Sequence, residues 1–386
     1  MEKQAEVVII GGGIVGASIA YHLAKRGMRS VVLLEKGRLG DGSTGRCLGG
    51  VRYQFSTSIN VRFSLESFRS FQNFQEELGV DPEFKRIGYL FLASTQGGEK
   101  ILREHIPLWH GLGIPVELLE ADEIRRRWPF IHTADILCGS YCAEEGYAGP
   151  YEVLMGYTKG AQRAGIQVYE GVEAKGILTE GGQVTGVWAG QDRISCSWVV
   201  NAAGPYAAQV GVMAGIEIPV KPLRRQIFST APYDRIPETI PLVIDLERGW
   251  YIRREREGFL LAGPQDKEPS LNDTLDGGLE ARAWSSESTL HRIPSLEDME
   301  INGGWAGLYE ISPDQHAILG QAPELRGFIC ANGFSGHGFM HSPMTGRLIA
   351  ELICEGQAST LDISSLSLAR FQAGNLIPEA ITAFRH

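Results

Sequence analysis

Three features that would settle the class of this protein at once are absent from its 386 residues. There is no cluster of basic residues, and 46 acidic against 36 basic side chains give a net charge of -10, which argues against nucleic acid as a partner. No apolar stretch approaches the roughly 20 residues of a membrane-spanning helix. We also find no internal repeat and no low-complexity segment. These absences leave a globular protein that binds small solutes or other proteins.

A secretory signal and a disulfide framework are missing as well. The first six residues are polar and lead straight into an apolar run, which leaves no room for a cleavable signal. The six cysteines are scattered, and the close pair Cys138 and Cys142 has no second Cys or His pair to complete a metal site. We therefore expect reduced thiols, no metal and a cytoplasmic location, with docking on a membrane through a partner left open.

What the chain does contain is a dinucleotide-binding fingerprint at its start. The apolar run Val7–Ile10 leads into Gly11-Gly12-Gly13-Ile14-Val15-Gly16 and then into an amphipathic helical pattern. The three motif glycines permit the tight turn, let the backbone approach a pyrophosphate, and allow close packing of helix on strand. A second apolar run ends in Glu35, about where a carboxylate binds ribose hydroxyls. An acid there would repel a 2′-phosphate, so NADP is disfavoured.

Helical and strand patterns alternate along the rest of the chain. We predict helices over 58–78, 151–164 and 344–353, and an interrupted helical stretch over 101–128. We predict strands over 89–92, 167–169, 174–179, 183–189, 198–201 and 328–331. The segment 220–317 is predicted to be mostly strand. Because the α/β pattern returns after an interruption, we expect the cofactor domain to be discontinuous.

Two further glycine-rich turns favour a flavin over a nicotinamide cofactor. The segment 40–45 follows the Glu35 strand directly, and the segment 332–339 lies far downstream and opens a helix. A nicotinamide dehydrogenase needs only the first glycine turn. A helix N-terminus at the last turn would stabilise the negative charge of a reduced isoalloxazine.

Together these segments resemble the FAD-dependent amino-acid oxidase superfamily, which includes glycine oxidase, sarcosine oxidases, D-amino-acid oxidase and the β subunits of L-proline dehydrogenase. The resemblance runs nearly end to end and rests on the fingerprint with Glu35, GSTG at 42–45, VVNAAG at 199–204, the segment 307–314 and GFSGHGF at 333–339. It implies an α/β fold, α+β overall. A discontinuous Rossmann-like FAD-binding domain (1–85, 145–219 and 318–386) would adjoin a substrate domain (86–144 and 220–317) with a mixed, largely antiparallel sheet.

The resemblance also implies which residues contact FAD. Glu35 is expected on the ribose, Ser43 and Thr44 near the pyrophosphate and flavin, and Val172 near the adenine. Some relatives attach the flavin through a cysteine or a histidine at positions that here hold Gly307 and, approximately, Arg46, so we expect non-covalent FAD. The expected cofactor contacts are Gly11, Gly13, Ile14, Val15, Gly16, Glu35, Lys36, Ser43, Thr44, Gly45, Arg46, Gly49, Gly50, Val172, Ala203, Gly204, Gly333, Ser335, Gly336, His337, Gly338, Phe339 and Met340.

Oxidation of an amine beside a carboxylate requires a cation that holds the carboxylate. Arg52 matches by position an arginine that does this in sarcosine oxidases. The second candidate is Arg253, with Tyr251 beside it, on a hairpin that we predict from the strand runs 250–253 and 259–262. Tyr309 aligns with a substrate-contacting position, and His337 is expected to have a structural and electrostatic role. Met340 replaces a lysine of monomeric sarcosine oxidase, which puts sarcosine itself in doubt.

The leading hypothesis is an FAD-dependent oxidation of a small amino acid or secondary amine such as proline, sarcosine, glycine or an N-methyl relative. Hydride transfer to the flavin would leave an imine that water hydrolyses. The alternatives are oxidation of a 2-hydroxy acid and a flavin-bearing subunit or assembly factor with little turnover of its own. The acceptor (dioxygen, a quinone or a partner subunit), the stereochemistry and the oligomeric state, homomeric or heteromeric, stay open.

Overall fold

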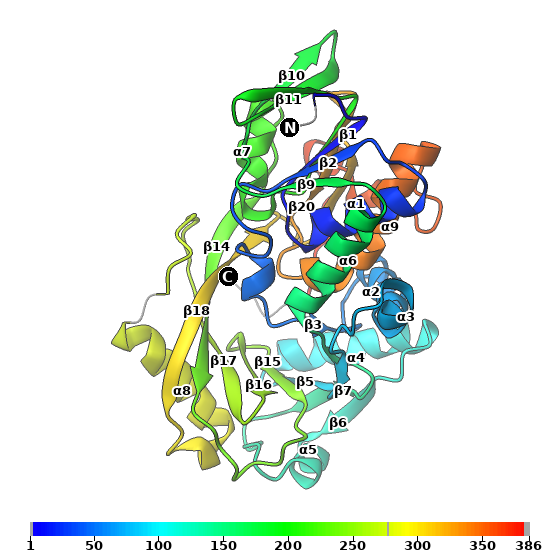
Figure 1. Ribbon diagram of the computed structural model, residues 1–386. Coiled ribbons are helices and arrows are strands. Elements are labelled where there is room, and N and C mark those ends of the chain that lie inside the picture. The colour runs from blue at the N-terminus through cyan, green and yellow to red at the C-terminus, as the bar shows by residue number, and fades with distance from the viewer. Residues whose placement is uncertain (1–2, 276–277, 382–386) are drawn as a thin grey trace.

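The computed structural model describes residues 3–275 and 278–381. One end of the molecule is built on a six-stranded sheet (Figure 1). In order, its strands are β19 (Ile318–Gln321), β20 (Phe328–Asn332), β13 (Trp198–Asn201), β1 (Val7–Ile10), β2 (Val31–Leu34) and β9 (Gln167–Tyr169). All neighbours pair in parallel except β19 and β20. The inner strands are continuous buried apolar runs, as parallel strands covered on both faces require.

Helices and a small sheet cover this six-stranded sheet. Three helices, α1 (Ile14–Lys25), α6 (Pro150–Arg163) and α9 (Gly338–Glu355), pack together on one face (Figure 1). Beyond the sheet lie α7 (Ala207–Met213) and an antiparallel sheet of β10 (Ala174–Glu180), β11 (Gln183–Ala189) and β12 (Asp192–Ser195). This arrangement confirms the Rossmann-like part of the predicted fold.

The other end is built on an eight-stranded sheet. In order, its strands are β18 (Ile301–Ile311), β14 (Lys221–Thr230), β17 (Gly258–Gln265), β16 (Trp250–Glu255), β15 (Leu242–Asp245), β5 (Tyr89–Ala93), β7 (Cys138–Cys142) and β6 (Glu117–Glu120). Only β15 and β5 pair in parallel. The predicted mixed, largely antiparallel sheet is therefore confirmed, while the exact domain boundaries stay a prediction.

The remaining elements surround these sheets. The helices are α2 (Ser58–Gln72), α3 (Phe74–Leu78), α4 (Gln96–Gly111), α5 (Ala121–Arg127), α8 (Leu279–Arg292) and α10 (Ala369–Gln372). The short strands β3 (Gly50–Val51), β8 (Gly146–Tyr147) and β4 (Lys85–Arg86) form a further small antiparallel sheet. Five strands lie in the described part of 220–317, as expected, and helix α8 is an element that the sequence did not predict there. Helix α9 begins six residues before the predicted start at 344.

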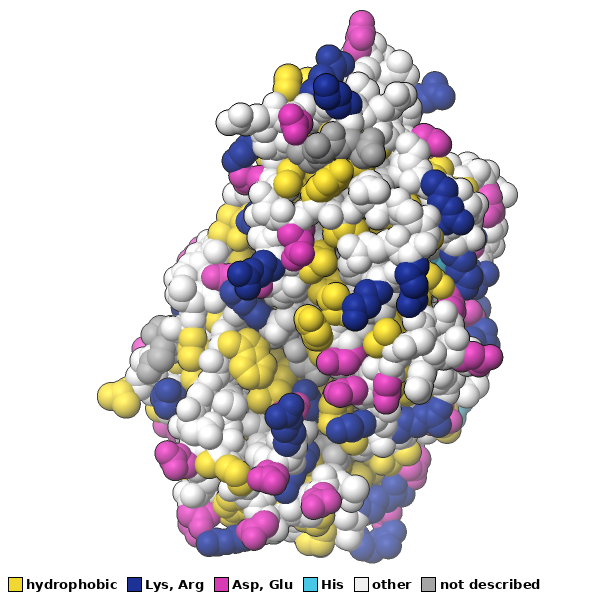
Figure 2. Space-filling view, in the orientation of Figure 1, with side chains coloured by type: hydrophobic (Ala, Val, Ile, Leu, Met, Phe, Trp, Pro, Cys, Tyr) yellow, Lys and Arg dark blue, Asp and Glu magenta, His cyan; other side chains and the backbone are white. Residues whose placement is uncertain are grey.

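Charged side chains of both signs are interspersed among the described residues on the face shown in Figure 2. Within the described part of the chain, no helix is long and apolar enough to cross a membrane. All six cysteines are free, and four of them, including Cys138 and Cys142, are buried.

Candidate active site

One cavity of about 460 Å³ joins the two ends of the molecule. Its walls come from the carboxyl ends of β1 and β2, the loop that follows β2, the residues after β13, the strands β14, β15, β16 and β18, and the start of α9. In open α/β sheets, ligands bind outside the carboxyl ends of the strands. The cavity extends from that position to the face of the eight-stranded sheet.

The turn between β1 and α1 presents backbone to the cavity. Gly11 has a φ of +112°, and a Cβ added there would lie 2.3 Å from the carbonyl oxygen of Ala202, so only glycine fits. Gly13 is the N-cap of α1, and no acidic side chain lies in the first turn of this helix. The positive end of the α1 dipole therefore faces the space where a pyrophosphate would lie.

Glu35 lines the cavity at the end of β2. One carboxylate oxygen accepts a hydrogen bond from the backbone N–H of Gly12 and the other from that of Gly37, each at 2.8 Å. The carbonyl of Glu35 accepts from the N–H of Val172 at 2.8 Å. These bonds bring together the residues that the sequence assigns to the ribose and the adenine.

The second glycine turn connects the two ends of the molecule. Thr44 accepts a hydrogen bond at Oγ1 from the N–H of Ile14 at 3.0 Å. Ser43 donates from Oγ to the carbonyl of Leu308 on β18 at 2.6 Å. The hydroxyl groups of the GSTG segment thus hold α1 and β18 at fixed positions around the cavity.

The third glycine turn begins α9 and faces the same cavity. Gly336 has a φ of +91°, and a Cβ added there would lie 2.9 Å from the ring of Tyr309. His337 is the N-cap of α9, whose first turn carries no acidic residue. Glu310 Oε2 accepts from the N–H of Gly333 at 2.9 Å, and burial raises the pKa of Glu310 to about 7. A second helix N-terminus is therefore directed at the cavity, as the sequence predicted.

The structure places most of the expected cofactor contacts in the wall of the cavity. They are Gly11, Gly13, Ile14, Val15, Glu35, Lys36, Ser43, Thr44, Arg46, Gly49, Gly50, Val172, Ala203, Gly204, Gly336, His337, Gly338, Phe339 and Met340.

Four of the expected cofactor contacts do not line the cavity. A Cβ on Gly16 would lie 2.0 Å from the carbonyl oxygen of Gly11, and one on Gly45 would lie 2.3 Å from that of Gly40, so both glycines serve close packing. Gly333 adopts a left-handed conformation in the third turn. The buried hydroxyl of Ser335 accepts from the N–H of Ser312 at 3.1 Å. These four residues shape the turns without facing the ligand space.

Arg52 supplies a buried cation at the substrate end of the cavity. Its guanidinium donates to the backbone carbonyls of Gln54 and Ile381, the latter at 3.1 Å, and lies 3.8 Å from the ring centre of Phe55. Among residues 3–275 and 278–381, no carboxylate oxygen comes within 4.0 Å of it. Because the groups that contact the guanidinium are neutral, the positive charge of Arg52 is available to an anion in the cavity.

A second arginine, Arg225 on β14, lines the cavity and was missed from the sequence. It donates to the carbonyl of Gly249, and its guanidinium carbon lies 5.2 Å from the ring centre of Tyr251. Tyr251 and Tyr309 also line the cavity, and burial together with the neighbouring Tyr251 raises the pKa of the Tyr309 phenol. The substrate end is therefore bounded by two arginines and two tyrosines.

Arg253, the second candidate for the carboxylate clamp, is not among the residues that line the cavity. Its guanidinium pairs with Glu255 at 2.7 Å, donates to the carbonyl of Arg254 at 2.9 Å, and lies 4.0 Å from the ring centre of Tyr147. The positive charge of Arg253 is thus paired within the protein.

The histidines near the cavity are neutral. Burial, and then the charge of Arg52, lower the pKa of His337 well below its usual value, and the same causes lower the pKa of His341 to about 3. His341 lies 3.0 Å from Ser64 Oγ, while His337 packs edge-on against Phe55. Of the two rings, only His337 lines the cavity, as an uncharged wall.

Comparison with known proteins agrees with this geometry. A model of the family described as "FAD dependent oxidoreductase" matches residues 6–352. The crystal structure of L-proline dehydrogenase from P. horikoshii has a TM-score of 0.90 and 34% sequence identity, and the match covers 98% of this chain and 100% of that one. "FAD-dependent oxidoreductase domain-containing protein 1" of Xenopus laevis is 33% identical over 96% of this chain and 83% of that protein.

The name of a further relative describes a regulatory role. The mitochondrial pyruvate dehydrogenase phosphatase regulatory subunit of Mus musculus is 28% identical over 100% of this chain. This chain spans only 45% of that relative's length.

The residues around the cavity fit FAD. The fit rests on the glycine-only turn at Gly11 below a helix N-terminus, on the fixed carboxylate of Glu35, and on the second helix N-terminus at Gly338. These groups match the pyrophosphate, the ribose and the electron-rich edge of the isoalloxazine in turn. FAD is the cofactor of this protein.

Proposed function

Because the chain belongs to the FAD dependent oxidoreductase family, we propose that it oxidises a small amino acid or secondary amine that carries a carboxylate, of the proline, sarcosine, glycine or N-methyl amino-acid type. The observation that carries this proposal is the buried guanidinium of Arg52, which lines the cavity and has neutral carbonyl partners. A forked guanidinium can bind a carboxylate through two charge-assisted hydrogen bonds. The similarity to L-proline dehydrogenase supports a cyclic secondary amine as the first substrate to test.

The protein's contribution to this reaction is binding and orientation. Arg52 holds the carboxylate, while Tyr251 and Tyr309 bound the space in which the amine and its neighbouring carbon lie. FAD, when bound, supplies the two-electron acceptor, so the C–N single bond of the substrate becomes an imine that water hydrolyses. Burial and the charge of Arg52 lower the pKa of His337, so this ring adds no further positive charge beside the substrate, whose amine must be neutral to give up a hydride.

The test is anaerobic mixing of the FAD-loaded protein with L-proline, sarcosine, glycine and lactate, one at a time. The proposal predicts loss of the visible flavin absorbance with at least one amino acid and none with lactate. Reduction by lactate alone would instead establish 2-hydroxy-acid oxidation.

A second candidate function is that of a flavin-bearing subunit with little turnover of its own. The similarity to the phosphatase regulatory subunit, along the whole of this chain, favours it. Its signature in the same experiment is a flavin that no amino or hydroxy acid reduces, although dithionite bleaches it.

A further inference from the structure

The C-terminal segment of the described chain reaches back to the substrate end of the cavity. The carbonyl of Ile381 accepts a hydrogen bond from Arg52 at 3.1 Å, across 329 positions of sequence. The other backbone partner of the guanidinium, Gln54, is only two residues away from Arg52. The position of the Arg52 side chain therefore depends on what holds Ile381 in place.

Glu379 holds this segment against the start of α2. Its Oε1 accepts from the N–H groups of Ser56 at 2.6 Å and Ile381 at 3.1 Å, and its Oε2 accepts from Asn60 Nδ2 at 3.0 Å and lies 3.3 Å from Thr57 Oγ1. Ser56 Oγ in turn accepts from the N–H of Ala380 at 2.7 Å. Glu379 is 7% exposed and is not among the residues that line the cavity.

The location of Glu379 is electrostatically favourable. Thr57 is the N-cap of α2, and its side chain makes no capping bond to the helix backbone. The carboxylate of Glu379 supplies the anion that this helix N-terminus attracts. Burial lowers the pKa of Arg52, and the charge of Glu379 is the largest of the contributions that oppose this shift.

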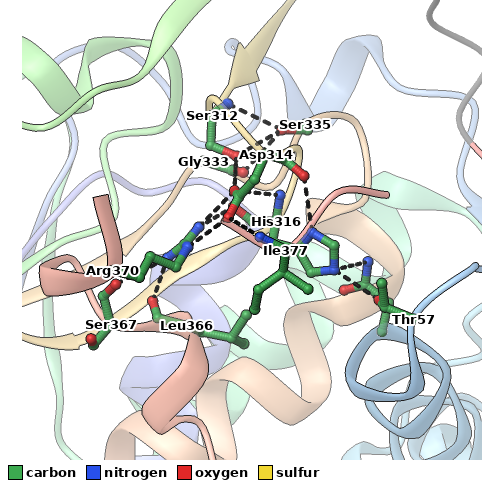
Figure 3. Close-up of polar contacts among 11 residues, drawn as sticks. Thr57, Ser312, Asp314, His316, Gly333, Ser335, Leu366, Ser367, Arg370 and Ile377 are labelled. Atoms are coloured by element: carbon green, nitrogen blue, oxygen red, sulfur yellow. Dashed lines mark hydrogen bonds and ion pairs between the residues drawn. The ribbon is translucent and has the colours of Figure 1, made fainter. Parts of the chain in front are cut away.

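A polar network connects the same segment to the third glycine turn (Figure 3). Asp314 forms a two-pronged ion pair with Arg370, with distances of 2.8 and 2.9 Å, and accepts from the N–H of Ile377 at 3.3 Å. His316 Nδ1 lies 3.0 Å from the carbonyl of Asp314 and so must carry the proton. Its Nε2 then accepts, at 2.8 Å, from Thr57.

Ser312 completes the network on the side of the glycine turn. Its hydroxyl donates to the carbonyl of His316 at 2.7 Å, and its N–H donates to Ser335 Oγ at 3.1 Å. Figure 3 shows these groups directed toward one another between α10 and the start of α2. One connected set of hydrogen bonds thus runs from the turn at the start of α9 to the segment that contacts Arg52.

We propose that residues 377–381 support the substrate site from outside the cavity and that Glu379 is a positioning residue, which fixes the carbonyl of Ile381 and thereby aims Arg52 at the substrate carboxylate. This role rests on the proposed function only for the identity of the anion. The direction in which carboxylate affinity changes when Glu379 is replaced separates this positioning role from a simple charge effect. If Glu379 acted only through its negative charge, removing that charge would tighten carboxylate binding at Arg52, whereas loss of positioning weakens it.

The test measures binding of tetrahydrofuran-2-carboxylate, an analogue without an amine, to the FAD-loaded protein from the change in flavin absorbance. We expect Glu379→Ala to raise the Kd about tenfold and Glu379→Gln, which keeps one acceptor oxygen, to raise it less. Ser56→Ala, a milder change that removes the acceptor of the Ala380 N–H, should act in the same direction. The limiting rate of flavin reduction by L-proline should change less than the apparent affinity.

The matched control is Glu66→Ala, which removes a carboxylate on α2 that pairs with Arg69. It should leave the Kd unchanged. An unchanged or lowered Kd in both Glu379 variants would overturn the positioning role. If the wild type binds the analogue but no amino acid reduces its flavin, the proposed oxidation fails while the role of Glu379 stands.

Discussion

A buried guanidinium is costly unless an anion or a set of acceptors compensates for its lost hydration. Arg52 has carbonyl acceptors and aromatic rings around it, and no carboxylate within ion-pair distance among the described residues. Such a residue stabilises a bound carboxylate more than it stabilises the empty protein. The sequence pointed to Arg52 because its position matches that of a carboxylate-binding arginine in sarcosine oxidases.

Replacing Arg52 tests this reasoning. We expect Arg52→Ala to retain FAD and to weaken amino-acid binding by about 2–3 kcal/mol, because a charge-assisted clamp is lost. Arg52→Lys should recover part of this loss, since an ammonium group attracts the carboxylate without the forked geometry. The measurement is the substrate concentration that half-reduces the flavin. The exposed Arg62→Ala on α2 is the control, and equal values in Arg52→Ala and the wild type would contradict the assignment.

Arg225 shows where residue-level prediction fails. The segment Arg224-Arg225 lies on a strand, and strand alternation sends the two side chains to opposite faces. The structure pairs Arg224 with Asp266 at 3.0 Å and directs Arg225 to the cavity. The sequence could not show which face of strand β14 points inward, because polar residues lie on both faces of this strand.

The residues at the attachment positions predict non-covalent flavin. Gly307 has no side chain, and Arg46 is paired with Asp273. Cys47 lines the cavity, but burial raises the pKa of its thiol to about 11, so the reactive thiolate is scarce near neutral pH. Acid precipitation of the protein should leave all yellow colour in the supernatant. Flavin that stays with the washed pellet would show a covalent bond.

Glu145 makes the stability of the protein depend on pH. It is fully buried and accepts from the N–H of Tyr53 at 2.5 Å and from the side chain of Gln54 at 2.6 Å. Burial nevertheless raises its pKa from 4.5 to about 7. Between those values the folded state holds a proton that the unfolded state has lost, so the free energy of unfolding falls as pH rises.

Glu145→Gln should remove this dependence. The difference in unfolding free energy between wild type and variant should change by about 3 kcal/mol from pH 4 to pH 8, with the wild type losing stability as pH rises. Denaturant unfolding at several pH values measures it. Parallel pH profiles for the two proteins would contradict the shifted pKa.

At the scale of elements, the glycine turns were predictable because their geometry admits few residues. Gly11 combines a positive φ with a Cβ position 2.3 Å from a carbonyl oxygen. Gly11→Ala should therefore weaken FAD binding by about 3 kcal/mol or more. On α4, a Cβ on Gly111 meets nothing within 4 Å, so Gly111→Ala should leave FAD affinity unchanged. Flavin fluorescence titration compares them, and equal affinities would refute the requirement for glycine at position 11.

Helix α8 was missed because its buried face is not apolar. Its buried positions are Ala281, Ser285, Ser288, Thr289 and Arg292. Ser285 and Thr289 bond to main-chain carbonyls, while Arg292 pairs with Asp245 at 2.6 Å. A periodicity search for large apolar residues cannot detect a helix that packs through small polar side chains and an ion pair.

At the scale of the whole molecule, the sequence predicted a Rossmann-like sheet and a second, largely antiparallel sheet. It did not predict the contacts between distant segments. The hydrogen bond from Arg52 to Ile381 and the ion pair of Arg370 with Asp314 join positions 329 and 56 residues apart. No local pattern encodes such pairs, because each partner is an ordinary residue in its own segment. The cavity itself is lined by segments as far apart in the chain as Ile10 and Met340.

The most direct test of the central claim is a crystal structure of the FAD complex with tetrahydrofuran-2-carboxylate. The account predicts the isoalloxazine beside the start of α9 and the carboxylate on the Arg52 guanidinium, at about 2.9 Å as in charge-assisted pairs. A carboxylate bound elsewhere, with Arg52 still directed only at the carbonyls of Gln54 and Ile381, would contradict it.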